Sequence, residues 1–257
     1  MRNPLIGALA AGVVVILAAS PAAADLAAAR NAYATLLSRY VTSRGVRYES
    51  WRSSGSDLKS ISEVLMPFRS TDPATLQPNE RKALYINIYN AKILEIVVLY
   101  NPKGSIKDLS RGTSGLEVFS RQVLDLDGKV ISLNGLEKRL REEFKDPRTH
   151  FALNRASKSS PPLRPEPYLP ETLDAQLDDA ARSYLASPGA VEVIRARGKV
   201  TIVVPKIFEW YADEFKASGG PLSFIRSFGP QEAADAIAGG KVKLQFADYD
   251  WSLNAAK

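Results

Sequence analysis

The hydrophobic and polar positions of the chain follow a helical rhythm over its first part. Residues 25–45 place apolar and aromatic side chains at helical spacing. Those positions are Leu26, Tyr33, Leu36, Leu37 and Tyr40. A connection that contains Trp51 leads to a second helical stretch at about residues 57–67. The pattern therefore predicts that the chain opens with two helices.

The strongest predicted helix is apolar on almost every side. Apolar residues run through 83–99, Asn79 is a candidate N-cap, and residues 101–102, Asn-Pro, end the segment. A helix with this composition belongs in the core of a globular fold. Asn87 and Asn90 interrupt it three residues apart, so they share one face and need polar partners there.

The rest of the chain mixes strands with helices. Alternation on both sides of Asp127-Gly128 in VLDLDGKVISL predicts a two-residue hairpin turn. Ser132 or Asn134 then caps the helix LEKRLREEF, with Glu137 in the capping-box position of Asn134. Later segments are the helix ETLDAQLDDAARSYLAS, the strand and helix KVTIVVPKIFEWYADEF, the segment PLSFIRSFGPQEAADAIAGG and a final strand in KVKLQFADYDWSLN. This order predicts an α+β fold, helix-rich, with a small and mainly antiparallel sheet.

The N-terminus has the features of a secretory signal peptide. Arg2 precedes an apolar run over residues 5–19, and three alanines at 22–24 precede Asp25. The run is short for a membrane span. We therefore expect a signal peptide at residues 1–24 and a single mature domain at 25–257. The expected product is periplasmic or secreted and is not an integral membrane protein after cleavage.

Composition narrows the chemistry. The chain has no cysteine, which excludes disulfides, thiolate nucleophiles and thiolate metal sites. Its formal net charge of +6 favours contact with anionic material in the cell envelope. The basic residues are spread along the chain and form no compact motif, so together with export they argue against a nucleic-acid partner.

Five ordered blocks resemble the bacterial family called domain of unknown function 547. The blocks are INIYNAK, KVISLNGLEKRLR, DPRTHFALNRASKSSPPLRPEPY, LDAQLDDAARSYL and DYDWSLN. The resemblance implies an exported or membrane-associated domain with no settled reaction. The family pattern carries cysteines where this chain has Arg155 and Ser160, and a histidine where it has Lys138. Any thiol chemistry of the family is therefore absent here.

The segment 146–170 holds the only histidine and suggests one catalytic arrangement. Ser160 would be the nucleophile, His150 the base, and Glu137 or Asp146 the group that orients the imidazole. Against this, no G-x-S-x-G elbow surrounds the serine, and the proline that follows it has no backbone donor for an oxyanion hole. The alternative is structural, with the imidazole and the nearby serines satisfying the backbone of the loop.

The second candidate arrangement binds a ligand. Asn87 and Asn90 either tie down the His150 segment or line a pocket. Glu137 and Arg141, four residues apart, form a surface ion pair by default.

Convergence of several arginines near Glu137 would instead suit a carboxylate or phosphate. The arginines in question are Arg148, Arg155 and Arg164.

The sequence gives little support for a metal site or a cofactor site. Asp125-x-Asp127-Gly128 matches the start of a calcium loop, but the later ligands are missing. One histidine and no cysteine disfavour zinc. We expect neither a metal nor a cofactor. Four aromatic residues at helical spacing are expected to pack in the core, with Trp251 beside them; they are Phe208, Trp210, Tyr211 and Phe215.

The sequence thus predicts an exported protein that is a ligand-binding or catalytically altered member of its family. Its ligand would be small and anionic or peptide-like. The residues expected to bind it are Asn87, Asn90, Glu137, Arg141, Arg148 and His150. Two alternatives stay open: an envelope hydrolase or transferase that uses Ser160, His150 and Glu137 in catalysis, and a purely structural envelope protein without a pocket.

Overall fold

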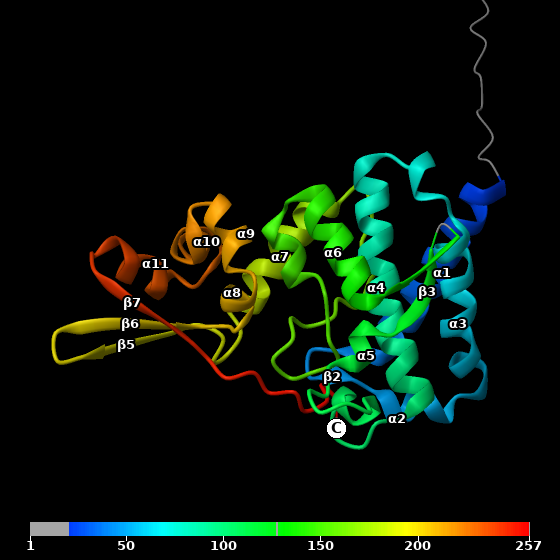
Figure 1. Cartoon of the computed structure of the whole chain (residues 1–257), viewed down its shortest axis with the longest axis horizontal. Helices are drawn as coiled ribbons and strands as arrows, with labels where there is room; N and C mark the ends of the chain where they lie inside the picture. Colours follow the sequence, from blue (N-terminus) through cyan, green and yellow to red (C-terminus); the bar gives the residue numbers. More distant parts are fainter. Residues whose placement is uncertain (1–20, 127, 257) are drawn as a thin grey trace, which may run out of the picture.

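A computed structural model describes residues 21–126 and 128–256. The predicted signal peptide lies outside the described residues up to position 20, as does Asp127 of the hairpin turn. The fold is α+β and rich in helix, as the sequence predicts, but its strands form three small sheets. Figure 1 shows helices α1–α4 at one end of the molecule and strands β5–β7 with helices α8–α11 at the other.

The first half of the described chain is a helical assembly with one short hairpin. Its elements are α1 (Pro21–Tyr40), β1 (Val41–Thr42), β2 (Gly45–Val46), α2 (Tyr48–Ser53), α3 (Gly55–Ser70), the 3-10 turn η1 (Pro73–Thr75), α4 (Pro78–Tyr100) and η2 (Ile106–Leu109). Helix α1 ends five residues earlier than predicted, because β-branched Val41 and Thr42 start a hairpin. The predicted connection also contains α2, which the sequence patterns did not show.

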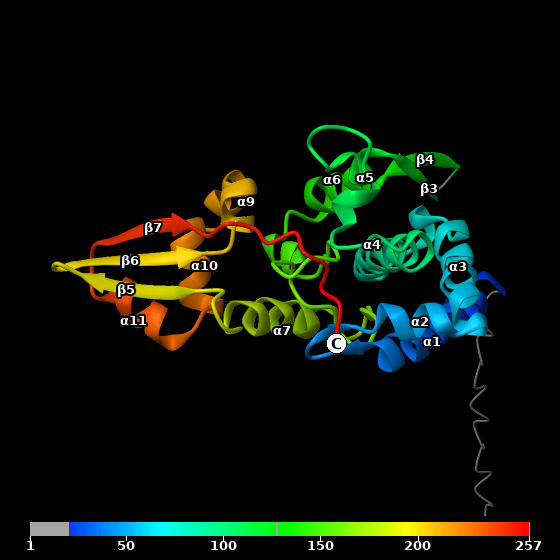
Figure 2. The same cartoon turned by 90° about the horizontal axis from the view of Figure 1, so that it is seen from below.

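Another backbone segment approaches this hairpin so closely that glycine is required at position 45. The φ of Gly45 is +119°, and an added Cβ would lie 2.1 Å from the backbone oxygen of Asn254. Val46 then pairs with Ala255 in a parallel bridge. The hairpin therefore anchors the C-terminal segment, which Figure 2 shows running from β7 past the middle of the molecule to β2.

Helix α4 is the central core helix. It is long and apolar enough to cross a membrane, yet 78% of its most apolar window is buried inside the protein, which accounts for its composition. The predicted cap at Asn79 is wrong: Gln77 is the N-cap, and its backbone N–H donates to Glu80 at 3.0 Å. The helix ends as predicted, with Asn101 in the left-handed conformation before Pro102.

The middle of the chain supplies a hairpin, three helices and one 3-10 turn. They are α5 (Glu117–Ser120), β3 (Gln122–Leu126), β4 (Lys129–Ser132), α6 (Leu133–Phe144), η3 (Pro147–Phe151) and α7 (Leu173–Leu185). Leu126 pairs with Lys129, so the hairpin has the predicted two-residue turn. Of the two candidate caps for α6, the structure uses Ser132, whose hydroxyl accepts from the N–H of Gly135 at 3.0 Å.

The C-terminal part builds the largest sheet. Strands β5 (Glu192–Ala196), β6 (Lys199–Val204) and β7 (Val242–Phe246) pair in that order, β5–β6 antiparallel and β6–β7 parallel. Between β6 and β7 lie α8 (Ile207–Trp210), α9 (Ala212–Ala217), α10 (Gly220–Phe228) and α11 (Gln231–Ala238). Strand β5 was not predicted. The final strand, β7, was predicted, although it ends before the DYDWSLN block.

Buried apolar side chains form two clusters. The larger is built around α1–α6, and the smaller joins Phe151, the end of α7, β6 and α8–α11. Helix α7 contributes to both, with Leu177 in the larger cluster and Ala181 in the smaller. The segment after η3, residues 152–163, is called the central loop below and contributes Ala152, Leu153 and Ala156 to the larger cluster. That the chain forms a single domain stays a prediction.

Candidate functional site

The two asparagines of α4 hold the segment that follows η3. Asn90 donates to the carbonyl of Ala152 and accepts from the N–H of Asn154, at 2.8 and 2.9 Å. Asn87 makes the same pair of bonds with the backbone of Tyr168, at 2.8 and 2.9 Å. Each buried amide thus replaces a missing backbone partner. These bonds confirm the loop-tying interpretation, whereas a direct role of the asparagines in binding a ligand stays a prediction.

The central loop itself contains a strained backbone position. Ala156 is fully buried and has φ +54°, which is uncommon for a residue with a Cβ. The Asn154 side chain accepts from the N–H of Ala156 at 2.8 Å, and the carbonyl of Ala156 accepts from Asn254 at 3.3 Å. This conformation turns the neighbouring Arg155 and Ser157 into different surroundings, so the loop separates two polar sites.

Ser160 lies in a closed group of hydroxyls. Ser157, Ser160 and Tyr249, called the hydroxyl ring below, are mutually 2.7 to 2.9 Å apart at their oxygens. Each hydroxyl has one proton to donate, and three contacts consume three protons. The Ser160 oxygen also accepts from the N–H of Arg155 at 2.9 Å. Its hydrogen-bonding capacity is therefore used within the protein.

His150 hydrogen-bonds to Glu214 and not to Ser160, the partner that a serine mechanism would need. The ring is buried, with 1% exposure, and its Nε2 is 2.8 Å from Oε2 of Glu214. Burial alone would raise the pKa of Glu214, but bonding to His150 and Arg141 outweighs it and lowers this pKa. The ionised carboxylate accepts, so Nε2 is the donor. Ser160 and His150 are therefore not hydrogen-bonded to each other in the structure.

The imidazole instead supports an aromatic side chain. His150 stacks on Tyr211 with ring centroids 3.8 Å apart and an interplanar angle of 20°. The Tyr211 hydroxyl in turn donates to Glu137. Burial, followed by the charge of Glu137, raises the pKa of Tyr211 despite the nearby Arg155, so the phenol keeps its proton. Within the described structure His150 thus makes no hydrogen bond to Glu137 and instead holds Tyr211, which contacts Glu137.

Arg155 and Glu137 form a buried ion pair. Nη2 of Arg155 donates to Oε1 of Glu137 and to the Tyr211 hydroxyl, both at 2.8 Å, and both charged residues are 5% exposed. Burial alone would lower the pKa of Arg155, but the charge of Glu137 and the nearby tyrosine hydroxyls together outweigh it, and the pKa is raised. The predicted capping-box role of Glu137 and its surface pair with Arg141 are wrong, because Arg141 pairs with Glu214 at 2.6 Å.

One group of this pair has no partner. Among the residues that the structure describes, Nη1 of Arg155 is shielded from solvent and makes no hydrogen bond. An unsatisfied buried donor is costly and therefore uncommon. Arg155 also lines a cavity with a volume of about 260 Å³, called the Arg155 cavity below. Its eight lining residues are Leu116, Phe119, Asn134, Glu137, Arg155, Trp210, Tyr211 and Trp251.

Aromatic side chains form part of the lining of the Arg155 cavity. The rings of Trp210 and Trp251 are 6.2 Å apart, and Arg155 lies 5.9 Å over Trp210 and over Tyr211. The core prediction for the four aromatics is half right. Phe208 and Phe215 are fully buried, but Trp210 is 40% exposed and its indole lies at the cavity.

Of the three arginines whose convergence near Glu137 would suit an anion, only Arg155 contacts Glu137. Arg148 binds Asp146, Asp174 and Asp178, with distances from 2.6 to 3.0 Å. Arg164 is paired with Asp179 and Glu166. Both are held by carboxylates of the protein, which accounts for them without a ligand. A ligand-binding role for Arg148 stays a prediction.

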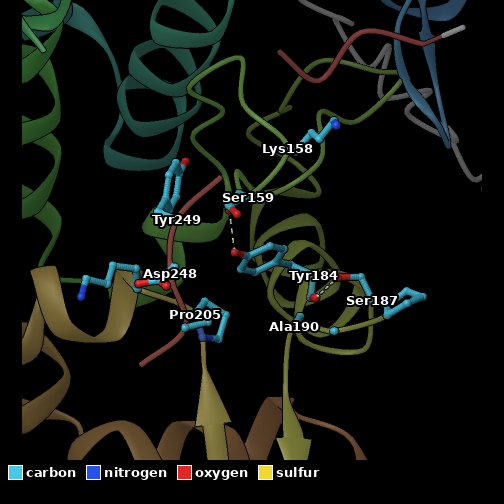
Figure 3. A pocket seen from close by; sticks show the side chains of 12 residues that line it. Lys158, Ser159, Tyr184, Ser187, Ala190, Pro205, Asp248 and Tyr249 are labelled. Atoms are coloured by element: carbon cyan, nitrogen blue, oxygen red, sulfur yellow. Dashed lines mark hydrogen bonds between the residues drawn. The ribbon is translucent and has the colours of Figure 1, made fainter. Parts of the chain in front are cut away.

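Two further cavities border the central loop. One, of about 300 Å³, includes Ser157, Ser160 and Arg44 in its lining. The other, of about 140 Å³, lies beneath Ser159 (Figure 3), where the Tyr184 hydroxyl donates to the Ser159 carbonyl at 2.8 Å. Within residues 21–126 and 128–256, no three histidine, aspartate or glutamate side chains are grouped to hold a metal ion.

Comparison with known proteins gives one match. Residues 73–185 match the model of a family described as "Protein of unknown function, DUF547". The matched span supplies Glu137 and Arg155 but ends before Trp210, Tyr211 and Trp251, so it does not reach the DYDWSLN block. No curated protein matches the chain, and no solved structure matches it.

Proposed function

We propose that this chain, which belongs to the DUF547 family through residues 73–185, is an exported, catalytically altered member that binds a small anionic ligand in the Arg155 cavity. The observation that carries the proposal is the guanidinium of Arg155. It is buried, it is held at Nη2 by Glu137, and its Nη1 has no partner in the described part of the chain.

The charge balance of the cavity favours a singly charged carboxylate. Arginine presents paired N–H groups that match the geometry of a planar carboxylate. Glu137 lies in contact with the same guanidinium, so a dianion such as phosphate would be repelled more strongly. A free or peptide C-terminal carboxylate and an organic acid both meet this requirement.

Of the residues predicted to bind a ligand, Glu137 alone lines this cavity. Arg141 lies 5.3 Å over the Tyr211 ring, and His150 stacks against that ring. Both would act by positioning Tyr211. Export to the periplasm is supported by the N-terminal sequence, with Arg2 and the apolar run over 5–19.

The alternative, an envelope hydrolase or transferase that uses Ser160, His150 and Glu137, has weaker support. It would require Ser160 to leave the hydroxyl ring and His150 to leave Glu214. Incubating the mature protein with a fluorophosphonate probe and reading the intact mass separates the two. Labelling at Ser160 that is lost in a folded His150→Ala variant would support the hydrolase, and we expect no labelling.

Ligand binding is tested by thermal denaturation in the presence of three carboxylates that differ in the rest of the molecule. They are benzoate, glucuronate and N-acetylalanine, at matched ionic strength. At least one should raise the Tm of the wild-type protein. The double variant R155Q/E137Q replaces the ion pair by two amides that can still hydrogen-bond, and it should show no rise. A rise of equal size in the folded double variant, or no rise in the wild type with any acid, would contradict the proposal.

A further inference from the structure

The Arg155 cavity is the right size for one ring. Its volume of about 260 Å³ exceeds the roughly 150 Å³ of an engineered protein cavity that binds benzene. A single six-membered ring with substituents fits this space. A monosaccharide unit and a substituted benzene ring are two ligand bodies of this size.

The walls distinguish these two bodies. Trp210 and Trp251 present indole rings tilted by 32° to each other, with Phe119 at 6.0 Å from Trp251. The same lining contains the polar residues Asn134, Glu137, Arg155 and Tyr211. The cavity thus combines flat apolar faces with a polar edge that contains donors and acceptors.

A flat aromatic acid would satisfy only part of this edge. Its carboxylate would bond to Arg155, while the exposed Asn134 would lose water without gaining a partner, which is unfavourable. A sugar ring has C–H groups on its face for the indoles and hydroxyls around its edge for the amide and carboxylate oxygens. Asn134 is exposed at this edge, where a ring hydroxyl can reach it.

We infer that the ligand is a sugar acid of the uronate type, either free or as a terminal unit. Its ring packs on Trp210 and Trp251, its hydroxyls meet Glu137 and Asn134, and its carboxylate pairs with the guanidinium of Arg155. This inference rests on the proposed function and adds the class of ligand. It also gives a role to the indole of Trp210, which is 40% exposed at the cavity.

The test is isothermal titration of the wild-type protein with glucuronate, glucose and benzoate in turn. Glucuronate should bind about tenfold or more tightly than either of the others, since it alone provides both the ring hydroxyls and the charge. Trp210→Ala should weaken glucuronate about tenfold by removing a stacking face. The control Tyr100→Ala removes an equally accessible aromatic, 69% exposed and outside the cavity, and should leave binding unchanged.

The possible failures are distinct. Benzoate binding as tightly as glucuronate would overturn the sugar class while leaving the carboxylate-binding function in place. Glucose binding as tightly as glucuronate would overturn the proposed role of Arg155. If none of the three binds and N-acetylalanine does, the function stands and the sugar class is wrong. If no acid binds the folded protein, both proposals are wrong.

Discussion

Arg155 and Ser160 lie on the same loop, and both stand where the family pattern that this chain resembles has cysteine. Their surroundings differ in one respect. The Ser160 hydroxyl donates and accepts within the hydroxyl ring and also receives the N–H of Arg155. The Arg155 guanidinium is bonded at Nη2 but not at Nη1, and it lines a cavity. A polar group with all its partners inside the protein stabilises the fold. Arg155 instead combines a buried N–H group, unsatisfied among the described residues, with a place in the lining of a cavity, and this combination is the basis of the proposed ligand site.

The largest effect should come from breaking the ion pair at the Arg155 site. Arg155→Met leaves Glu137 buried with only the Tyr211 hydroxyl as a partner, and we expect a loss of about 3–5 kcal/mol in the free energy of unfolding. Chemical denaturation measures it. R155Q/E137Q should be much closer to the wild type, because no charge is left unpaired. A single variant as stable as the double variant would mean that Glu137 is not held as a buried anion.

The support of the loop should be the next most sensitive. Asn90→Ala leaves the carbonyl of Ala152 and the N–H of Asn154 without their partner, at a cost of about 2–4 kcal/mol. Asn87→Ala removes an equivalent pair of bonds from Tyr168, away from the central loop. The two variants should lose similar stability, but ligand binding should fall further in Asn90→Ala. Equal ligand affinity in the two variants would mean that the central loop does not support the Arg155 cavity.

A charge cluster outside the cavity provides a pH test. Burial alone would raise the pKa of Asp146, but bonds from Arg148 and from Lys82, at 2.5 Å, lower it from 3.8 to about 2. The folded-state pKa is therefore below the unfolded one. This contribution of about 2 kcal/mol is present above pH 4 and is lost as the pH falls from about 4 to 2.

Asp146→Asn should accordingly lower the free energy of unfolding by about 2 kcal/mol at neutral pH. The acid limb of the stability curve, which is the loss of stability between about pH 4 and 2, should become flatter. Urea denaturation at several pH values measures both. An unchanged limb in the variant would show that other carboxylates set the acid stability. Carboxylate-ligand binding at neutral pH should persist in this variant, because Asp146 does not line the Arg155 cavity.

The smallest effect is expected at the hydroxyl ring. Ser160→Ala removes the acceptor of the Arg155 N–H and opens the ring, which should cost about 1–2 kcal/mol. Ser157→Ala opens the same ring but leaves that N–H bonded, so it should cost less. Stability curves of the two variants measure the difference. A larger loss in Ser157→Ala would mean that the backbone bond to Ser160 adds little.

The local elements of the fold were predictable, because their signals are short-range. The two-residue turn between β3 and β4, the end of α4 at Asn101 and the helix α7 all follow from neighbouring residues. The short strands β1 and β5 were missed, since they depend on pairing partners rather than on a strong pattern of their own.

The candidate site was predictable only in part, for a physical reason. Asn87 and Asn90 were recognisable as buried amides that need partners, and Glu137 as a residue of interest. The partner of Glu137 was not, because Arg155 and Tyr211 come from segments far apart in the chain. Aromatic spacing on α8 and α9 likewise did not reveal that Trp210 faces a cavity while Phe208 faces the core.

The most direct measurement of the central claim observes the Arg155 guanidinium itself. Arginine side-chain signals are recorded by ¹⁵N NMR during a titration with glucuronate, and the Arg155 signal is assigned by its loss in R155Q/E137Q. The account predicts that this signal shifts with the ligand, while those of Arg148 and Arg164, held by their own carboxylates, stay in place. Saturable binding with an unmoved Arg155 signal would contradict it.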